Sequence, residues 1–141
     1  MEIRELATDA EREPAVPILR QLWTDADPEE VLAWTGDDRY TLFGRFDGDE
    51  LVAVAGVRID DFLHHVRHAW LYDLVVDEPR RGEGHGTALV EFVEEWADER
   101  DCDRVALASP RSKEGVHEFY ADRDYERWGY VIETELSDQN L

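Results

Sequence analysis

The feature that most constrains this chain is an apolar run followed at once by a glycine-rich turn and an amphipathic segment. Residues 69–76 (AWLYDLVV) are almost continuously apolar and β-favouring, which is typical of a central strand covered on both faces. Glycines follow at alternate positions, Gly82, Gly84 and Gly86. Residues 87–100 then place their apolar side chains at helical spacing. This order predicts a buried strand that leads through a tight turn into a helix N-terminus.

The turn has the properties of an anion-binding site. Glycine lets a ligand approach the backbone closely and tolerates unusual dihedral angles. The N–H groups at a helix start point at one spot and lie at the positive end of the helix dipole. Arg80 and Arg81 flank the turn in a chain that has only 15 Lys and Arg residues. We therefore expect a phosphate or pyrophosphate here; the alternative is a glycine-rich helix start that binds nothing.

Two common phosphate-binding motifs do not fit. A P-loop requires Gly-Lys-Ser/Thr, and the turn contains no lysine. A dinucleotide-binding fingerprint requires G-x-G-x-x-G after an early strand, whereas this spacing is G-x-G-x-G and lies past the middle of the chain.

The rest of the chain alternates between strand and helix character. Helices are expected after N-caps at Thr8-Asp9 and Asp27, and over 87–100 and 112–122. Other expected strands cover 1–7, 40–46, 51–59, 104–108 and 125–136, with a hairpin turn at 47–50. Polar residues 60–68 are expected to form a connection. The order predicts one domain over 1–141 of the α/β (α+β) class, with a mixed sheet and helices on both faces.

The charge is strongly acidic, with 35 Asp and Glu residues and a formal net charge of -20. Such a surface repels nucleic-acid phosphates and anionic headgroups, so we expect neither nucleic acid nor membrane as a partner. The acidity either attracts cationic partners or adapts the protein to a cytoplasm at very high salt. We favour the second interpretation, a halophilic source, because the acids are spread along the whole chain.

Other features narrow the setting. No stretch approaches 18 apolar residues and the N-terminus is acidic, so a cytoplasmic protein is expected. The single Cys102 forms no internal disulfide. The histidines at positions 64, 65 and 68 lack a companion cysteine or spaced acid cluster, so no metal is expected. The tryptophans at positions 23, 34 and 70 are expected in the core, with substrate contact as the alternative.

The spacing Arg81-x-x-Gly84-x-Gly86 resembles the Arg/Gln-x-x-Gly-x-Gly/Ala signature of the GNAT superfamily, the acetyl-CoA-dependent N-acetyltransferases. Residues 73–109 are similar to that family's strand, pyrophosphate loop, helix and following strand. The segment KEGVHEFYADRDY (113–125) resembles its C-terminal motif, and residues 3–60 resemble its N-terminal strands more weakly.

The resemblance implies a GNAT-like mixed sheet with antiparallel N-terminal strands and splayed parallel central strands. It implies that backbone amides of the turn hold the pyrophosphate of CoA, while the edge of the preceding strand binds the pantetheine arm. Lys113 stands where the family often has Asn, so it either reaches an adenosine phosphate or is a solvated helix-start lysine. The implied cofactor residues are Leu74, Val75, Val76, Arg81, Gly82, Glu83, Gly84, His85, Gly86, Thr87 and Lys113.

The resemblance also implies a reaction, the direct transfer of acetyl from acetyl-CoA to a primary amine in a ternary complex. Tyr120 falls at the family's tyrosine position and is the expected acid for the leaving thiolate; a packed core tyrosine is the alternative. Asp73 is costly inside an apolar strand unless it is paired. It is expected to act as the base, to orient a water or to pair with an arginine. Relatives often have Glu-Asp where this chain has Tyr72-Asp73, which leaves the family's glutamate base in doubt.

The sequence thus predicts an acyltransferase whose acceptor is an amine on a small molecule or a protein, with a homodimer among the expected assemblies. A rival from another class is a non-catalytic acyl-CoA-binding sensor or regulatory module, which would keep the glycine turn but not depend on Tyr120. A third is another enzyme of phosphate-bearing ligands.

Overall fold

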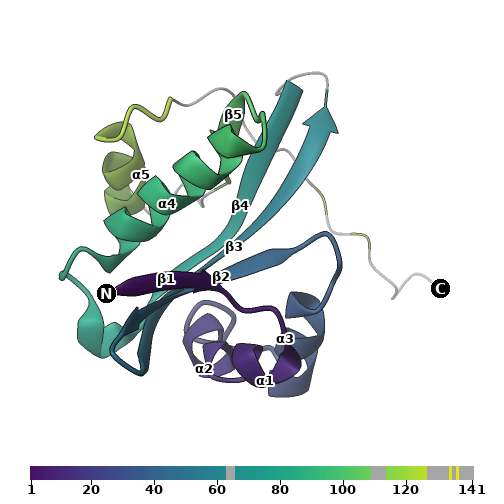
Figure 1. Ribbon diagram of the computed structural model, residues 1–141, viewed down its shortest axis with the longest axis vertical. Coiled ribbons are helices and arrows are strands. Elements are labelled where there is room, and N and C mark those ends of the chain that lie inside the picture. Colours follow the sequence, from purple (N-terminus) through teal and green to yellow (C-terminus); the bar gives the residue numbers. More distant parts are fainter. Residues whose placement is uncertain (63–65, 109–113, 127–133, 135, 137–141) are drawn as a thin grey trace. The chain divides into compact units, whose positions relative to one another are not determined.

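The computed structural model describes residues 1–62, 66–108, 114–126, 134 and 136, in two compact units, Met1–Leu107 and Ala108–Leu141. The described part of the first unit contains a five-stranded sheet with the order β1-β2-β3-β4-β5 (Figure 1). The first three pairings are antiparallel and β4 pairs with β5 in parallel, which confirms the expected mixed sheet. The strands are β1 (Glu2–Glu5), β2 (Thr41–Asp47), β3 (Glu50–Phe62), β4 (Val66–Val76) and β5 (Arg104–Ala106).

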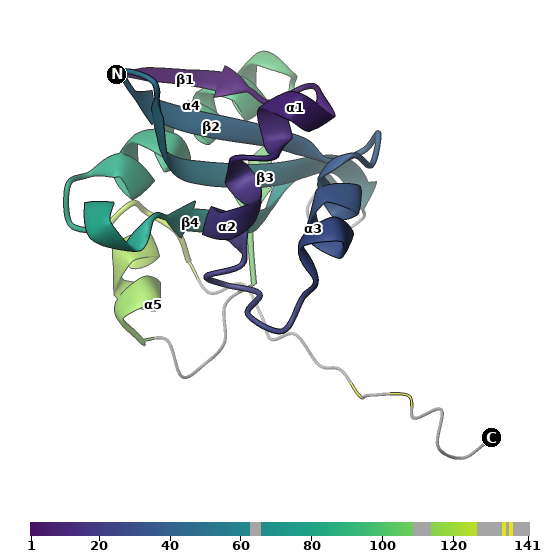
Figure 2. The same ribbon diagram turned by 90° about the horizontal axis from the view of Figure 1, so that it is seen from below.

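Helices lie on both faces of this sheet, as expected. Helices α1 (Asp9–Arg12), α2 (Ala15–Leu19) and α3 (Pro28–Thr35) lie on one face and α4 (His85–Glu99) on the other (Figures 1 and 2). The first helical region is divided into two short helices because proline, here Pro14, lacks the N–H group that a continuing helix needs.

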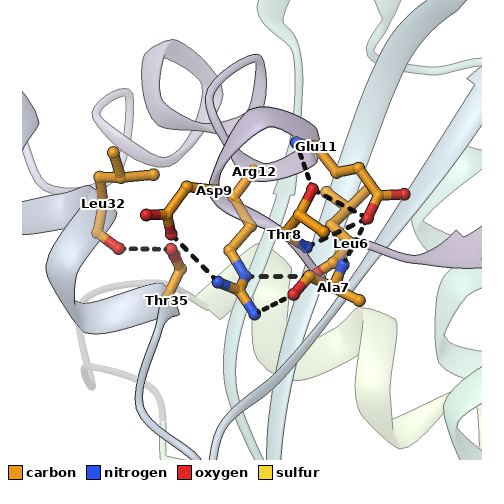
Figure 3. A network of polar contacts seen from close by, with 8 residues as sticks. All are labelled: Leu6, Ala7, Thr8, Asp9, Glu11, Arg12, Leu32 and Thr35. Atoms are coloured by element: carbon orange, nitrogen blue, oxygen red, sulfur yellow. Dashed lines mark hydrogen bonds and ion pairs between the residues drawn. The ribbon is translucent and has the colours of Figure 1, made fainter.

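The start of the helical layer is fixed by a capping box at Thr8 (Figure 3). The amide of Glu11 donates to the Thr8 hydroxyl at 3.2 Å, and the amide of Thr8 donates to the Glu11 carboxylate at 3.0 Å. The Arg12 guanidinium donates to the carbonyls of Leu6 and Ala7. These bonds set the direction in which the chain leaves β1 and enters the helices.

Two apolar layers hold the helices to the sheet. On one face, Val54 and Val75 of the sheet belong to a buried cluster with side chains of α2 and α3. On the other face, Phe43 of β2 meets the rings of Phe92 and Trp96 of α4 edge to face, with centroids 5.0 and 5.2 Å away.

The connection expected at residues 60–68 is wrong for the residues that the structure describes there. β3 continues to Phe62 and β4 begins at Val66, so that Asp60 pairs with His68. Salt bridges of Asp60 with Arg58 and of Asp61 with Arg67 balance charges that would otherwise disfavour a strand pair. Buried His68 belongs to β4, whereas positions 64 and 65 lie outside the described residues.

A β-bulge divides β4 at Tyr72. Gly56 pairs with Asp73 and Val57 pairs with Leu71, so Tyr72 is the extra residue. Asp73 therefore shares the α1–α3 face with Val75, whereas Leu71 shares the α4 face with Val57. Tyr72 itself is 50% exposed, so the prediction that this strand is covered on both faces is wrong at this position.

The second unit contains α5 (Glu114–Ala121), which confirms the helix expected over 112–122. Tyr120 is buried in it, and its ring packs against those of Phe119 and Tyr125. Most of the strand expected over 125–136 lies outside the described residues. Among the described helices none is long and apolar enough to cross a membrane.

Candidate active site

The glycine turn adopts the conformation that its sequence predicts. It follows the short 3₁₀ helix at Glu78–Arg80 and ends where α4 begins, at His85, two residues before the predicted start. Gly82 and Gly84 have φ of +81° and +91°, which residues with a Cβ rarely adopt. A Cβ at either glycine would meet nothing within 4 Å, so open space lies beside this backbone.

The start of α4 directs backbone donors out of this turn. The first bond that reaches back to the Gly84 carbonyl comes from the amide of Ala88, at 3.1 Å. Amides at the beginning of the helix therefore face out of its positive end. This arrangement is suited to a phosphate or pyrophosphate group.

Arg80 does not supply charge to such an anion, which corrects the expectation that both arginines do. Its guanidinium forms salt bridges with Asp47, Glu50 and Glu83. Hydrogen bonds to Asp47 and then to Glu83 raise the pKa of Arg80 above its ordinary value. Arg80 thus joins the turn to the β2–β3 hairpin, and carboxylates neutralise its positive charge.

Arg81 is held by neutral groups instead. Its guanidinium donates to the Val76 carbonyl at 3.1 Å and to the Gln21 side-chain oxygen at 3.2 Å. In the part of the chain that the structure describes, no carboxylate forms a salt bridge with it. Two hydrogen bonds therefore hold the positive charge of Arg81 at the turn, and no described carboxylate within salt-bridge distance neutralises it.

His85 ties the turn to the sheet below it. Its side chain is buried, and its Nδ1 lies 3.0 Å from Nε of Arg45, which can only donate. Nε2 must then bear the proton that is donated to Glu83 at 2.9 Å. Hydrogen bonds from His85 and then Arg80 lower the pKa of Glu83, so this carboxylate stays ionised and paired.

In the described chain, the outer edge of β4 has a strand partner over only part of its length. Among the described residues, β5 pairs with β4 only at His68, Ala69 and Trp70. Residues 74–76 thus extend past the paired part of that edge before the chain enters the turn. The bulge at Tyr72 lies between the two parts.

Among the residues with described positions, two side chains donate to Asp73, and neither is an arginine. The Tyr40 hydroxyl donates to Oδ2 at 2.6 Å and the Trp23 Nε1–H donates to Oδ1 at 2.7 Å. The arginine pairing weighed for Asp73 is therefore not found within the described residues. Because each carboxylate oxygen has a further lone pair, Asp73 can still accept a hydrogen bond from a substrate.

Gly56 makes room for this arrangement. It pairs with Asp73 across the strands, and a Cβ placed on it would lie 1.7 Å from the Tyr40 hydroxyl oxygen. Burial, followed by the charge of Asp73, raises the pKa of Tyr40, so its phenol keeps the proton that it donates.

Gln21 joins the α2–α3 connection to the turn. Its amide donates to Asp77 at 2.7 Å, and its oxygen accepts from the Glu78 amide at 3.1 Å. The same oxygen accepts from Arg81. The α2–α3 connection thus contacts the site twice: Gln21 bonds to the turn, and Trp23, two positions later, bonds to Asp73.

Sequence reasoning missed Tyr40 and Gln21, and it expected Trp23 and Trp34 in the core. Both indoles are instead about half exposed. The one usable signal for Tyr40 was Gly56, since a glycine inside an apolar strand indicates close approach of another group. Lys113 lies outside the described residues.

Tyr120, the predicted acid, is protonated at neutral pH. Burial raises its pKa to about 12. The phenol is therefore protonated at any pH below that range.

Comparisons with known proteins agree with this geometry. A model of the acetyltransferase (GNAT) family matches residues 2–125. The chain is 28% identical over 138 residues to a Bacillus subtilis (strain 168) protein named "Uncharacterized N-acetyltransferase YhdJ", a match that covers 95% of this chain and 94% of that protein.

Solved structures show the same fold. Aminoglycoside N-acetyltransferase AAC(6')-Iy in complex with CoA is similar with a TM-score of 0.84 and 17% identity, over 96% of this chain and 93% of that one. A putative acetyltransferase from Agrobacterium tumefaciens str. C58 is similar with a TM-score of 0.78 and 22% identity, over 95% of this chain and 100% of that one. Because the family model spans most of the sequence, the chain belongs to the acetyltransferase (GNAT) family.

Proposed function

We propose that this acyltransferase moves an acetyl group from acetyl-CoA to a primary amine by direct attack within a ternary complex. The observation that supports this most is the order of features along β4. The pairing with β5 that the described residues show ends at Trp70, the carboxylate of Asp73 follows the bulge, and the glycine turn follows Val76. A donor arm along this edge would bring its reactive end toward Asp73.

The residues of the turn fit a CoA pyrophosphate. Gly82 and Gly84 leave open space beside the backbone. The guanidinium of Arg81 is held by neutral groups, so its positive charge can attract the pyrophosphate. The carboxylate of Glu83 is paired with Arg80 and His85, which reduces its repulsion of an anion. Residues 74–76 would bind the pantetheine arm. When bound, acetyl-CoA supplies the thioester that the amine attacks.

Asp73 would prepare the acceptor for attack. An alkylamine with a pKa near 10.4 is mostly protonated at neutral pH and must lose a proton before it can attack. Tyr40 and Trp23 fix both oxygens of Asp73, so the lone pairs that remain are aimed in set directions. In this proposal Asp73 binds the amine and accepts its proton, directly or through one water.

The acceptor in this proposal is a small-molecule amine, as the names of the aminoglycoside acetyltransferases among the similar structures suggest. We also propose that the net charge of -20 is an adaptation to a salty cytoplasm. The assays below are therefore to be run in molar KCl.

Tyr120→Phe tests the proposed acid. We expect turnover to fall by about a hundredfold or more, because the leaving thiolate then lacks its proton donor. The variant should also lose a tyrosinate absorbance step near pH 12. Folding raises this pKa from 10.0 to about 12, so its contribution to stability is complete below about pH 10 and is lost as the pH rises through 12. Thiol release and a spectroscopic pH titration measure these two effects.

Calorimetric titration with CoA is the control for Tyr120→Phe, and we expect unchanged affinity. Unchanged turnover would contradict the role of Tyr120. If the unaltered protein binds CoA but releases no thiol with any amine, the non-catalytic sensor is the better description.

Arg81→Ala and Arg80→Ala form a matched pair. We expect Arg81→Ala to weaken CoA binding roughly tenfold or more, because a charge-assisted bond to phosphate is worth about 1.5–3 kcal/mol. Arg80→Ala should chiefly lower the melting temperature, since it leaves Asp47, Glu50 and Glu83 without their shared cation. Calorimetry and thermal unfolding separate the two effects. The opposite pattern, weak CoA binding in Arg80→Ala alone, would show that the two roles are exchanged.

A further inference from the structure

Exposed aromatic side chains are concentrated around Asp73. Trp23 is 46% exposed, and Trp34 and Tyr72 are each 50% exposed. They are the aromatic members of the strongly exposed large apolar side chains in the described chain. Trp23 bonds to Asp73, Trp34 contacts Trp23, and Tyr72 precedes Asp73. Exposed apolar groups gathered at one place indicate a binding surface.

The two indoles are ordered although they are exposed. Nε1–H of Trp23 is fixed by Asp73 at 2.7 Å. The ring of Trp34 meets that of Trp23 edge to face, with centroids 6.5 Å apart and planes at 82°. A surface held in place in this way loses little conformational freedom when a ligand binds.

Core packing does not account for these side chains. The buried cluster beneath them is built from residues such as Leu19 and Val31, with Ala26, Leu32 and Tyr40 packed against it. Neither indole belongs to that cluster. Within the described residues, the exposed half of each indole therefore adds nothing to the packing of this cluster.

We infer that Trp23 and Trp34 form the specificity surface of the acceptor site and that they select a primary amine attached by a short linker to a flat apolar ring. This inference rests on the proposed function. An amine held by Asp73 lies directly beside Trp23, because the two side chains are bonded. The rest of the acceptor then meets the indole surfaces.

The chemistry of the indoles favours an aryl group over a polyhydroxylated one. Indole has one hydrogen-bond donor and no acceptor, and in Trp23 that donor is already used by Asp73. At most the Nε1–H of Trp34 is left to donate to the hydroxyl groups of a sugar-like framework, so such a framework would lose more hydration against this surface than it regains in hydrogen bonds. An aromatic ring gains dispersion and stacking contacts there.

Trp34→Ala tests the inference with phenethylamine as the aryl probe and with ethanolamine and kanamycin as hydrophilic probes. We expect kcat/KM for phenethylamine to fall about tenfold, which corresponds to roughly 1.4 kcal/mol, and the loss to lie in KM. Values for the hydrophilic amines and the affinity for CoA should not change. Trp34→Phe should restore most of the preference. Trp96→Phe, on the opposite face of the sheet, is the control and should leave it intact.

Direct binding separates failure of this inference from failure of the proposed function. Calorimetry of phenethylamine with the CoA-loaded protein should show binding that Trp34→Ala weakens by a similar factor. If no amine is acetylated but this difference persists, the proposed function fails, and the two indoles stand as a binding surface for aryl amines and not as part of an acceptor site. Equal effects of Trp34→Ala on all three amines, or none, would overturn the inference. So would a change of oligomeric state in Trp34→Ala, because the indoles would then cover a second copy of the chain.

Discussion

We expect Asp73→Asn to fold normally and to acetylate its acceptor about 10²–10⁴ times more slowly than the unaltered protein. The amide oxygen of asparagine can accept from Trp23, while its NH₂ group donates to a Tyr40 hydroxyl that has rotated to accept. Shape and hydrogen bonds are therefore preserved, and only the negative charge is lost. The loss should appear in kcat, measured by thiol release at saturating acetyl-CoA.

Tyr40→Phe is the matched control for this substitution. It removes one hydrogen bond to Asp73 but leaves the charge in place. We expect a cost in stability of about 1 kcal/mol and a smaller loss of kcat than in Asp73→Asn. If Tyr40→Phe lowers kcat as much as Asp73→Asn does, Asp73 acts through its geometry and not through its charge. A fully active Asp73→Asn would remove Asp73 from the proposed chemistry.

Gly56→Ala should damage stability and activity together. The new Cβ would lie 1.7 Å from the hydroxyl oxygen of Tyr40 and 2.2 Å from the ring carbon that bears it, so the whole phenol must move. Overpacking typically costs about 1–3 kcal/mol, and we expect about the upper end because the Tyr40 hydroxyl is held between Gly56 and Asp73. Thermal unfolding and thiol release measure the two losses.

Gly44→Ala in β2 is the comparison for Gly56→Ala. Its Cβ would meet the ends of the Leu51 and Leu6 side chains at 2.8 and 3.2 Å and the edge of the Phe46 ring at 3.2 Å. The shortest of these contacts is with a flexible side-chain end, which can shift. We therefore expect a smaller loss of stability and little loss of kcat. Combining Gly56→Ala with Tyr40→Ala should destabilise the protein less than the sum of the single effects, because the new Cβ then no longer meets a phenol ring. Additive effects would contradict the explanation through Tyr40.

The parts of the site that local sequence determines were predictable. A glycine at a left-handed position and an apolar helix face leave clear patterns, and both the turn and α4 are found where those patterns indicate. Pairings between distant residues leave no such pattern. Tyr40 and Asp73 are 33 positions apart, and Trp23 and Asp73 are 50 apart, so their meeting depends on how α2 and α3 pack on the sheet.

Arg80 illustrates the same limit for charge. Its place beside the glycines favoured a phosphate ligand, whereas its partners Asp47 and Glu50 come from the β2–β3 hairpin. The strand expected to end before residue 60 continued because Arg58 and Arg67 neutralise the acids of the strand pair. For Arg80 the deciding carboxylates lie 30 and 33 positions away, whereas the arginines of the strand pair lie close in sequence to the acids that they neutralise.

The short connection after α2 has a consequence for how this protein can diverge. Gln21 holds Asp77 and Arg81 at the glycine turn, and Trp23, two positions later, holds Asp73. A mutation that reshapes this connection to admit another amine also shifts Gln21, whose side chain binds Arg81. Mutations that change the acceptor specificity are therefore expected to change the affinity for the acetyl donor as well. Replacements that restore this affinity are to be sought at Gln21.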